Sequence, residues 1–99
     1  MSDADIVARV TLYATSAGGR QGPTPSDKFG CLLIVEQSCF DCRLLLSETG
    51  ALHPGASAVV PIKFLYPDLA KDLLEVGSRF LLRDGKVVGE GEVQELLIA

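Results

Sequence analysis

The pattern that most constrains the fold lies near the end of the chain, where Asp84-Gly85 separates two strand-like segments. An Asp-Gly pair tolerates the positive φ that a tight turn between antiparallel strands requires, so residues 79–83 and 86–96 are predicted to form a β-hairpin. The second segment contains Gly89-Glu90-Gly91. Glycine weakens a strand, and its presence inside one predicts a bulge, a barrel corner or the close approach of another backbone.

Hydrophobic patterning predicts four more strands before this hairpin. Residues 6–14 alternate between an apolar face and a mixed face, which is typical of a half-buried strand. Short apolar segments bounded by turn-forming or polar residues predict the others, at 31–36, 42–47 and 56–66. Pro61 lies inside the last of these segments. Proline has no amide hydrogen to donate to a neighbouring strand, so this position predicts an edge, a bulge or a barrel rim.

Two other segments interrupt the strand pattern. Residues 16–28 contain three glycines and two prolines, which predicts a long loop. Residues 68–76 place three leucines at helical spacing before Gly77, which predicts a short helix. Together the elements predict a single all-β domain over residues 1–99, a six-stranded antiparallel closed β-barrel with one short helix inserted before the final hairpin. Residues 1–5 are expected to be disordered.

Composition narrows the classes of function. Nine lysines and arginines against thirteen aspartates and glutamates give a formal net charge of −4, which disfavours nucleic-acid binding because affinity for phosphates comes largely from basic residues. No apolar segment approaches the ~18 residues of a membrane-spanning helix, so no membrane association is expected. The first residues lack a secretory signal pattern, and three cysteines cannot all pair within one chain. Both features favour a reducing, cytoplasmic location.

Three groups of residues keep the order and spacing of a known family. They are Gly18-Gly19-Arg20 with Pro23, the Pro54-Gly55 turn, and the ending with Arg79-Phe80 and Val88-Gly89-Glu90-Gly91-Glu92-Val93. In this order they resemble the C-terminal β-barrel domain of elongation factor Tu and of related translation-factor GTPases. The resemblance extends over residues 7–96. It implies the same barrel in a stand-alone chain and a link to translation.

The resemblance also implies where a partner binds. In the family this barrel packs against a GTP-binding domain, contacts aminoacyl-tRNA and meets an exchange factor. The corresponding partner-binding positions here are Gly18, Gly19, Arg20, Pro23, Gly89, Glu90 and Gly91. No Gly-x4-Gly-Lys-Ser/Thr loop is present, so this chain is not expected to bind GTP. Glu90 and Glu92 place carboxylates where the family approaches RNA, and like charges repel.

The cysteines allow several kinds of chemistry. Cys39-Phe40-Asp41-Cys42 is a C-x-x-C pair, a pattern that can bind zinc or cycle between dithiol and disulfide. A closed zinc site needs four ligands, and only Cys31 and His53 remain to complete one. Four interpretations stay open: a thiol redox site at Cys39 and Cys42, a zinc site, small buried or half-buried cysteines near a turn, or a reversible Cys39–Cys42 disulfide without a biological role. No metal or other cofactor is predicted.

Other titratable residues give no catalytic prediction. His53 is the one histidine of the sequence and lies in a turn, where a solvated side chain is expected rather than a catalyst. Arg20 either contacts a partner, as the resemblance implies, or fixes the long loop by donating hydrogen bonds to backbone carbonyls. A role in RNA binding would predict a contiguous basic stripe, formed by Arg20, Lys28, Arg79, Arg83 and Lys86.

Apolar residues exceed what a small barrel can bury. In the runs 44–46, 73–74 and 96–98, strict alternation cannot place every side chain inside. We therefore expect an exposed apolar barrel face that binds a protein partner or a second copy of the chain. The leading hypothesis is a non-enzymatic, stand-alone interaction module. One alternative is a translation accessory protein that binds RNA or the ribosome, and a further alternative is a thiol redox or metal-binding protein using Cys39 and Cys42.

Overall fold

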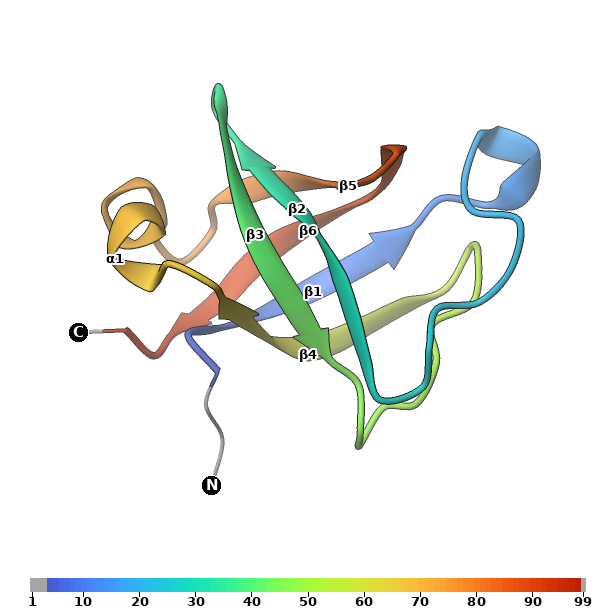
Figure 1. Cartoon of the computed structure of the whole chain (residues 1–99), viewed down its shortest axis with the longest axis horizontal. Coiled ribbons are helices and arrows are strands. Elements are labelled where there is room, and N and C mark those ends of the chain that lie inside the picture. Colours follow the sequence, from blue (N-terminus) through green and yellow to red (C-terminus); the bar gives the residue numbers. More distant parts are fainter. Residues whose placement is uncertain (1–3, 99) are drawn as a thin grey trace.

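The six strands expected from the sequence close into a barrel in the computed structural model, which describes residues 4–98 (Figure 1). The order around the barrel is β1-β4-β3-β2-β5-β6, with β6 closing onto β1, and every pairing is antiparallel. The strands are β1 (Ile6–Leu12), β2 (Lys28–Val35), β3 (Ser38–Leu45), β4 (Ser57–Phe64), β5 (Arg79–Asp84) and β6 (Lys86–Leu96). The predicted fold class is confirmed.

The helical residues are fewer than the sequence predicts. Helix α1 covers Pro67–Ala70 and continues into one 3₁₀ turn, Lys71–Leu73. Leu74 then adopts an extended conformation and is buried. The burial of this leucine ends the helix before Gly77, so the helical segment stops short of the predicted residue 76. A second 3₁₀ turn, Thr15–Ala17, starts the long loop after β1.

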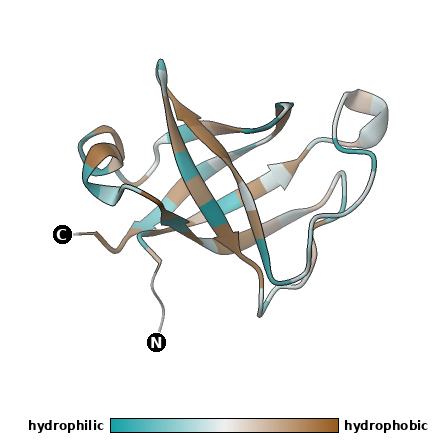
Figure 2. Cartoon of the chain, viewed as in Figure 1, coloured by the Kyte–Doolittle hydropathy of each residue, from teal (hydrophilic) through white to brown (hydrophobic). Residues whose placement is uncertain are grey.

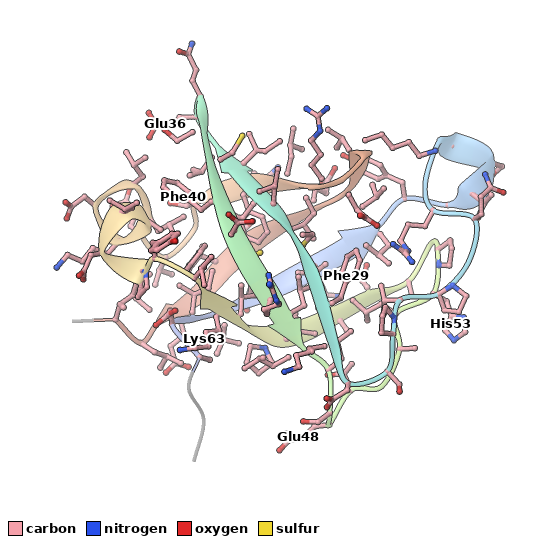
Figure 3. All side chains as sticks on the ribbon, viewed as in Figure 1. Phe29, Glu36, Phe40, Glu48, His53 and Lys63 are labelled. Carbon is pink, nitrogen blue, oxygen red and sulfur yellow. The ribbon has the colours of Figure 1, made fainter. Side chains whose placement is uncertain are left out.

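Strand β3 starts at Ser38 rather than at residue 42, because β2 and β3 are joined by a two-residue turn. Val35 pairs with Ser38, and Glu36 adopts a φ of 56° at the tip of the hairpin (Figure 3). A non-glycine residue in this region is uncommon, so the sequence does not mark the turn. The whole C-x-x-C segment therefore lies within β3.

The Asp-Gly hairpin is confirmed, with a tighter turn than expected. Asp84 pairs with Lys86 as a strand residue, and Gly85 alone occupies the tip, with a φ of 77°. The register shifts between Leu82 and Arg83. A glycine with positive φ followed by an irregular register is typical of hairpins that combine a short turn with a bulge.

The barrel interior is filled by alternate residues of the six strands, so polar and apolar stripes alternate along the ribbons (Figure 2). Ala70 and Leu74, from the segment between β4 and β5, are buried against the same core. Pro61 pairs with Val7 of β1, and the pairing of β4 with β3 ends at Ile62. Pro61 therefore lies where the β3 side of the strand is unpaired, which agrees with the edge alternative among the three that the sequence predicted.

The start of the described chain is fixed by Asp5. Its backbone N–H donates to the Ile62 carbonyl at 2.8 Å, and its Oδ2 accepts a 2.8 Å bond from the Phe64 N–H. The Asp5 carbonyl accepts a further bond from the Leu97 N–H. The expected disorder of residues 1–5 therefore does not extend to Asp5, and residues 1–3 lie outside the described residues.

Replacing Asp5 with alanine is expected to lower the free energy of unfolding by about 1–2 kcal/mol, because the buried Phe64 N–H loses its acceptor. Asp5→Asn retains an acceptor oxygen and should recover more than half of the loss. Asp72→Asn, in an exposed 3₁₀ turn, is the control with no expected effect. Urea unfolding checks all three variants. Equal stability of Asp5→Ala and the wild type would show that this anchor contributes nothing.

Candidate functional site

Arg20 holds the long loop against the barrel. Its Nη1 forms an ion pair of 2.5 Å with Asp84 Oδ2, next to the tip of the β5–β6 hairpin. Nε donates to the Gly22 carbonyl and Nη2 to the Pro23 carbonyl, each at 3.3 Å. The guanidinium also lies over the Phe29 ring, 4.8 Å from its centroid. These contacts correspond to the second alternative, in which Arg20 fixes the long loop. The guanidinium binds groups of its own chain, so its position is explained without an external partner.

The two glycines before Arg20 serve the same loop. Gly18 has a φ of 91° and ends the 3₁₀ turn by donating to the Thr15 carbonyl. A Cβ on Gly19 would lie 2.0 Å from the Tyr13 carbonyl oxygen. The Gly19 N–H donates to the Ala14 carbonyl at 2.9 Å. The Gly-Gly-Arg motif therefore has an internal structural explanation.

The glycines of β6 are required by neighbours within the barrel. A Cβ on Gly89 would lie 2.6 Å from the Thr11 carbonyl oxygen, and a Cβ on Gly91 would lie 2.4 Å from Cζ of the buried Phe80. The close approach expected from the Gly-x-Gly pattern is confirmed, and the approaching groups are β1 and Phe80. Sequence reasoning identified the glycines but not the groups that they accommodate.

Glu90 points outward between these glycines and accepts a 3.1 Å hydrogen bond from the Tyr13 hydroxyl. Desolvation, followed by this hydrogen bond and by the negative charge of Glu90, raises the pKa of Tyr13 above its usual value. The pair ties the end of β1 to β6. The sequence predicted a carboxylate at this place on the barrel surface, and Glu90 provides it. Its hydrogen-bond donor is Tyr13 of the same chain.

A groove of about 560 Å³ crosses the outer face of β1, β6, β5 and β2. Its charged residues alternate in sign from strand to strand: Arg9 is opposite Glu92, and Glu92 is 3.6 Å from Arg79. The groove therefore contains no continuous basic stripe. Of the five basic residues that would form an RNA-binding stripe, Arg20 and Arg79 each pair with a carboxylate.

The C-x-x-C cysteines do not face each other. Residues three apart on a strand point to opposite faces, so Cys39 is exposed and Cys42 is buried. Cys42 instead faces Cys31 of β2, with the two Sγ atoms 3.8 Å apart. The hydrogen bond with Cys31, and then burial, raise the pKa of Cys42 far above its usual value. A Cys39–Cys42 disulfide is absent in this arrangement.

No cluster for a metal forms in the part of the chain that the structure describes. Within residues 4–98, no group of three or more histidine, cysteine, aspartate or glutamate side chains could hold a metal ion. His53 is exposed on the loop before β4 (Figure 3). The zinc interpretation, which needed His53 beside the cysteines, has no set of ligands among these residues.

The end of β4, α1, the approach to β5 and the end of β6 lie at the same end of the barrel (Figure 1). Six of the eight large exposed hydrophobic residues found in residues 4–98 belong to segments at this end. They extend from the end of β4, through α1 and the approach to β5, to the end of β6. We call this set the α1-end surface: Leu65, Tyr66, Leu69, Val76, Leu96 and Leu97.

Hydrogen bonds tie the segments of the α1-end surface to the barrel. The Leu65 N–H donates to the Asp41 carbonyl, and the Leu97 N–H donates to the Asp5 carbonyl. The Gly77 N–H, next to Val76, donates to the Val93 carbonyl at 2.8 Å. The backbone that carries these side chains is therefore held in place by hydrogen bonds. The side chains themselves extend into solvent: Leu69 is 65% and Tyr66 60% exposed.

The location of the surface differs in part from the sequence prediction. Of the predicted apolar runs, Leu44, Leu46 and Leu74 are buried, whereas Leu96 and Leu97 are exposed. Sequence reasoning missed Leu65, Tyr66, Leu69 and Val76 as exposed residues. A signal was available at Leu65, because strand alternation places it on the face opposite the buried Ile62 and Phe64.

No protein-family model matches the chain, and no curated protein sequence matches it. The resemblance to the elongation factor Tu barrel therefore stays a prediction from the order of short motifs. In residues 4–98, the helices are too short and too polar to cross a bilayer.

Proposed function

We propose that this barrel is a non-enzymatic interaction module that binds a protein partner through the α1-end surface. The observation that carries the proposal is the gathering of six large exposed apolar side chains at one end of the molecule. Contact with a partner would remove their surface from water, at a gain of roughly 25 cal/mol per Å² of apolar area. Exposed apolar residues gathered at one end of a molecule are more typical of interaction sites than scattered single residues are.

The composition of the surface supports a protein partner. It combines one tyrosine with aliphatic side chains, and aromatic residues are enriched at the centres of interfaces. The segments beneath it are anchored by Ala70 and Leu74, which are buried in the core. A partner would thus bind a preformed surface and would not have to order it first, which reduces the entropic cost of binding.

Two alternatives have less support. A translation accessory role through RNA would use basic side chains, yet Arg20 and Arg79 are engaged by Asp84 and Glu92. A thiol or metal role through Cys39 and Cys42 would need both sulfurs on one face, and β3 separates them. If RNA is nevertheless the partner, its affinity should fall steeply with salt, whereas apolar binding should not.

The proposal is tested by comparing two double variants with the wild type in affinity capture from lysate. Leu69→Ser with Leu97→Ser removes apolar area from the α1-end surface. Val59→Ser with Leu81→Ser is the matched control, because these two residues are also exposed and apolar but lie on the sides of the barrel. A specific partner should be retained by the wild type and the control, and its affinity for the α1-end variant should fall at least tenfold.

Light scattering after size exclusion, at about 100 µM protein, decides whether the partner is a second copy of the chain. A dimer of the wild type and the control that becomes monomeric in the α1-end variant would identify self-association. Equal thermal unfolding of the two variants serves as the check on folding. A monomeric wild type whose retained proteins do not change in the α1-end variant would overturn the proposal.

A further inference from the structure

We infer that Cys31 and Cys42 form a site of reversible disulfide modification, closed by a hydroperoxide-class oxidant and opened by thiols. The two residues are directly opposite in the β2–β3 pairing. Their Sγ atoms lie 3.8 Å apart, and both are free thiols in this structure. This inference is independent of the proposed interaction at the α1-end surface.

The backbone geometry already suits a disulfide. Residues directly opposite in an antiparallel pair have Cα atoms about 4.5–5.5 Å apart, and disulfides span Cα separations of about 4.4–6.8 Å. The sulfurs must move from 3.8 Å to about 2.05 Å. Rotation about the side-chain bonds supplies this movement, so the strands do not have to separate. Cys39 has no such partner, because it is exposed on the outer face.

The surroundings give the two thiols different roles. Cys42 is fully buried, and the hydrogen bond with Cys31 favours its protonated form. Cys31 is 8% exposed, whereas Cys42 is 0% exposed. Cys31 is therefore the thiol that a small oxidant reaches first, and Cys42 is the resolving thiol.

The chemistry balances in two steps. The Cys31 thiolate attacks one oxygen of the hydroperoxide, so an S–O bond forms and the O–O bond breaks, and the released oxygen leaves as alcohol or water after taking a proton. The Cys42 sulfur then attacks the Cys31 sulfenic acid. An S–S bond forms, the S–O bond breaks, and water leaves with the proton of the Cys42 thiol. Two thiols lose two electrons in total, and the hydroperoxide gains them.

The disulfide would raise the stability of the barrel against unfolding. Strands β2 and β3 are neighbours in the order β4-β3-β2-β5. The disulfide would therefore cross-link two adjacent strands on the side that faces the barrel interior. A cross-link that closes a loop of about ten residues restricts the unfolded chain. The oxidised protein should therefore unfold about 5–15 °C higher than the reduced protein.

The experiment uses the full chain with Cys39→Ser, which removes the exposed thiol and with it intermolecular disulfides. After treatment with hydrogen peroxide and removal of the excess, thiols are counted in denaturant. The expected count falls from two to zero, and the mass falls by about 2 Da, one hydrogen per thiol. Dithiothreitol should restore both thiols. Non-reducing peptide mapping should link the peptides that contain Cys31 and Cys42.

The control variants are Cys39→Ser with Cys31→Ser and Cys39→Ser with Cys42→Ser, each of which keeps one buried thiol. Neither should lose mass or gain thermal stability on oxidation. The wild-type chain, mapped in the same way, guards against an effect of the Cys39 substitution. The inference is overturned if both thiols of the Cys39→Ser protein remain free after peroxide while the chain stays folded, or if Cys31 is oxidised to sulfinic acid without linkage to Cys42.

Discussion

Replacing Gly19 with alanine is expected to lower the free energy of unfolding by about 3 kcal/mol, which corresponds to a fall in Tm of about 12–24 °C for a domain of this size. The added Cβ would lie 2.0 Å from the Tyr13 carbonyl oxygen and 2.9 Å from that of Ala14. Both neighbours are backbone atoms, so no change of rotamer relieves the overlap. The loop has to move, which breaks the bond from the Gly19 N–H to Ala14.

Gly22→Ala is the matched control in the same loop. A Cβ at this position meets no atom within 4 Å, and the backbone there does not require glycine. Alanine at residue 22 should therefore be neutral or stabilise the fold slightly, by restricting the unfolded chain. Thermal unfolding followed by circular dichroism checks both variants. If Gly19→Ala unfolds at the same temperature as Gly22→Ala, the loop adjusts without cost and Gly19 has no structural requirement.

The sequence predicted the architecture of the barrel because its strongest signals are local. Strict alternation in β1 and the Asp-Gly turn between β5 and β6 are properties of adjacent residues. Both elements form, although β1 ends at Leu12, two residues before its predicted end, and Gly85 alone occupies the turn. The start of β3 was misplaced because its turn depends on Glu36 adopting positive φ. Glutamate rarely adopts this conformation, so the residue type does not indicate a turn here.

The candidate sites were harder to predict, because they depend on which residues face each other across strands. The C-x-x-C spacing suggested that Cys39 and Cys42 form a pair, yet the strand period places them on opposite faces. The thiol that does face Cys42 is eleven positions away in the sequence, on β2. Only the register of the β2–β3 hairpin reveals this pair, and the register depends on the turn that the sequence did not mark.

The same argument applies to the motifs behind the family resemblance. Gly19, Gly89 and Gly91 each accommodate a group of this chain at a distance that a side chain would not allow. Their spacing is therefore explained by the closure of the barrel, whatever the protein binds. These motifs therefore indicate the barrel fold and do not indicate a function, because a barrel without a tRNA partner would need the same glycines. The α1-end surface carries more information on function, because its large apolar side chains remain 36–65% exposed to water.

Arg20→Ala is expected to lower the free energy of unfolding by about 2–3 kcal/mol, or about 8–24 °C in Tm. The substitution removes the ion pair with Asp84, two hydrogen bonds to loop carbonyls and the cation–π contact with Phe29. The Arg20 side chain is only 21% exposed, so water replaces these contacts incompletely. In Arg20→Lys the side chain keeps its charge but lacks the planar guanidinium that contacts Asp84 and both carbonyls at once. This variant should therefore recover less than half of the lost free energy of unfolding.

Arg79→Ala is the matched control for Arg20→Ala. Arg79 also pairs with a carboxylate, at 3.6 Å, but its side chain is 82% exposed. Its removal should change the free energy of unfolding by no more than about 0.5 kcal/mol. Urea unfolding measures the three variants, and the binding of the captured partner is measured in parallel. An Arg20→Ala variant that is as stable as Arg79→Ala, yet no longer binds the partner, would show that Arg20 is a contact residue, as the elongation factor resemblance implies. The interaction surface would then lie on the loop after β1 and not at the α1 end.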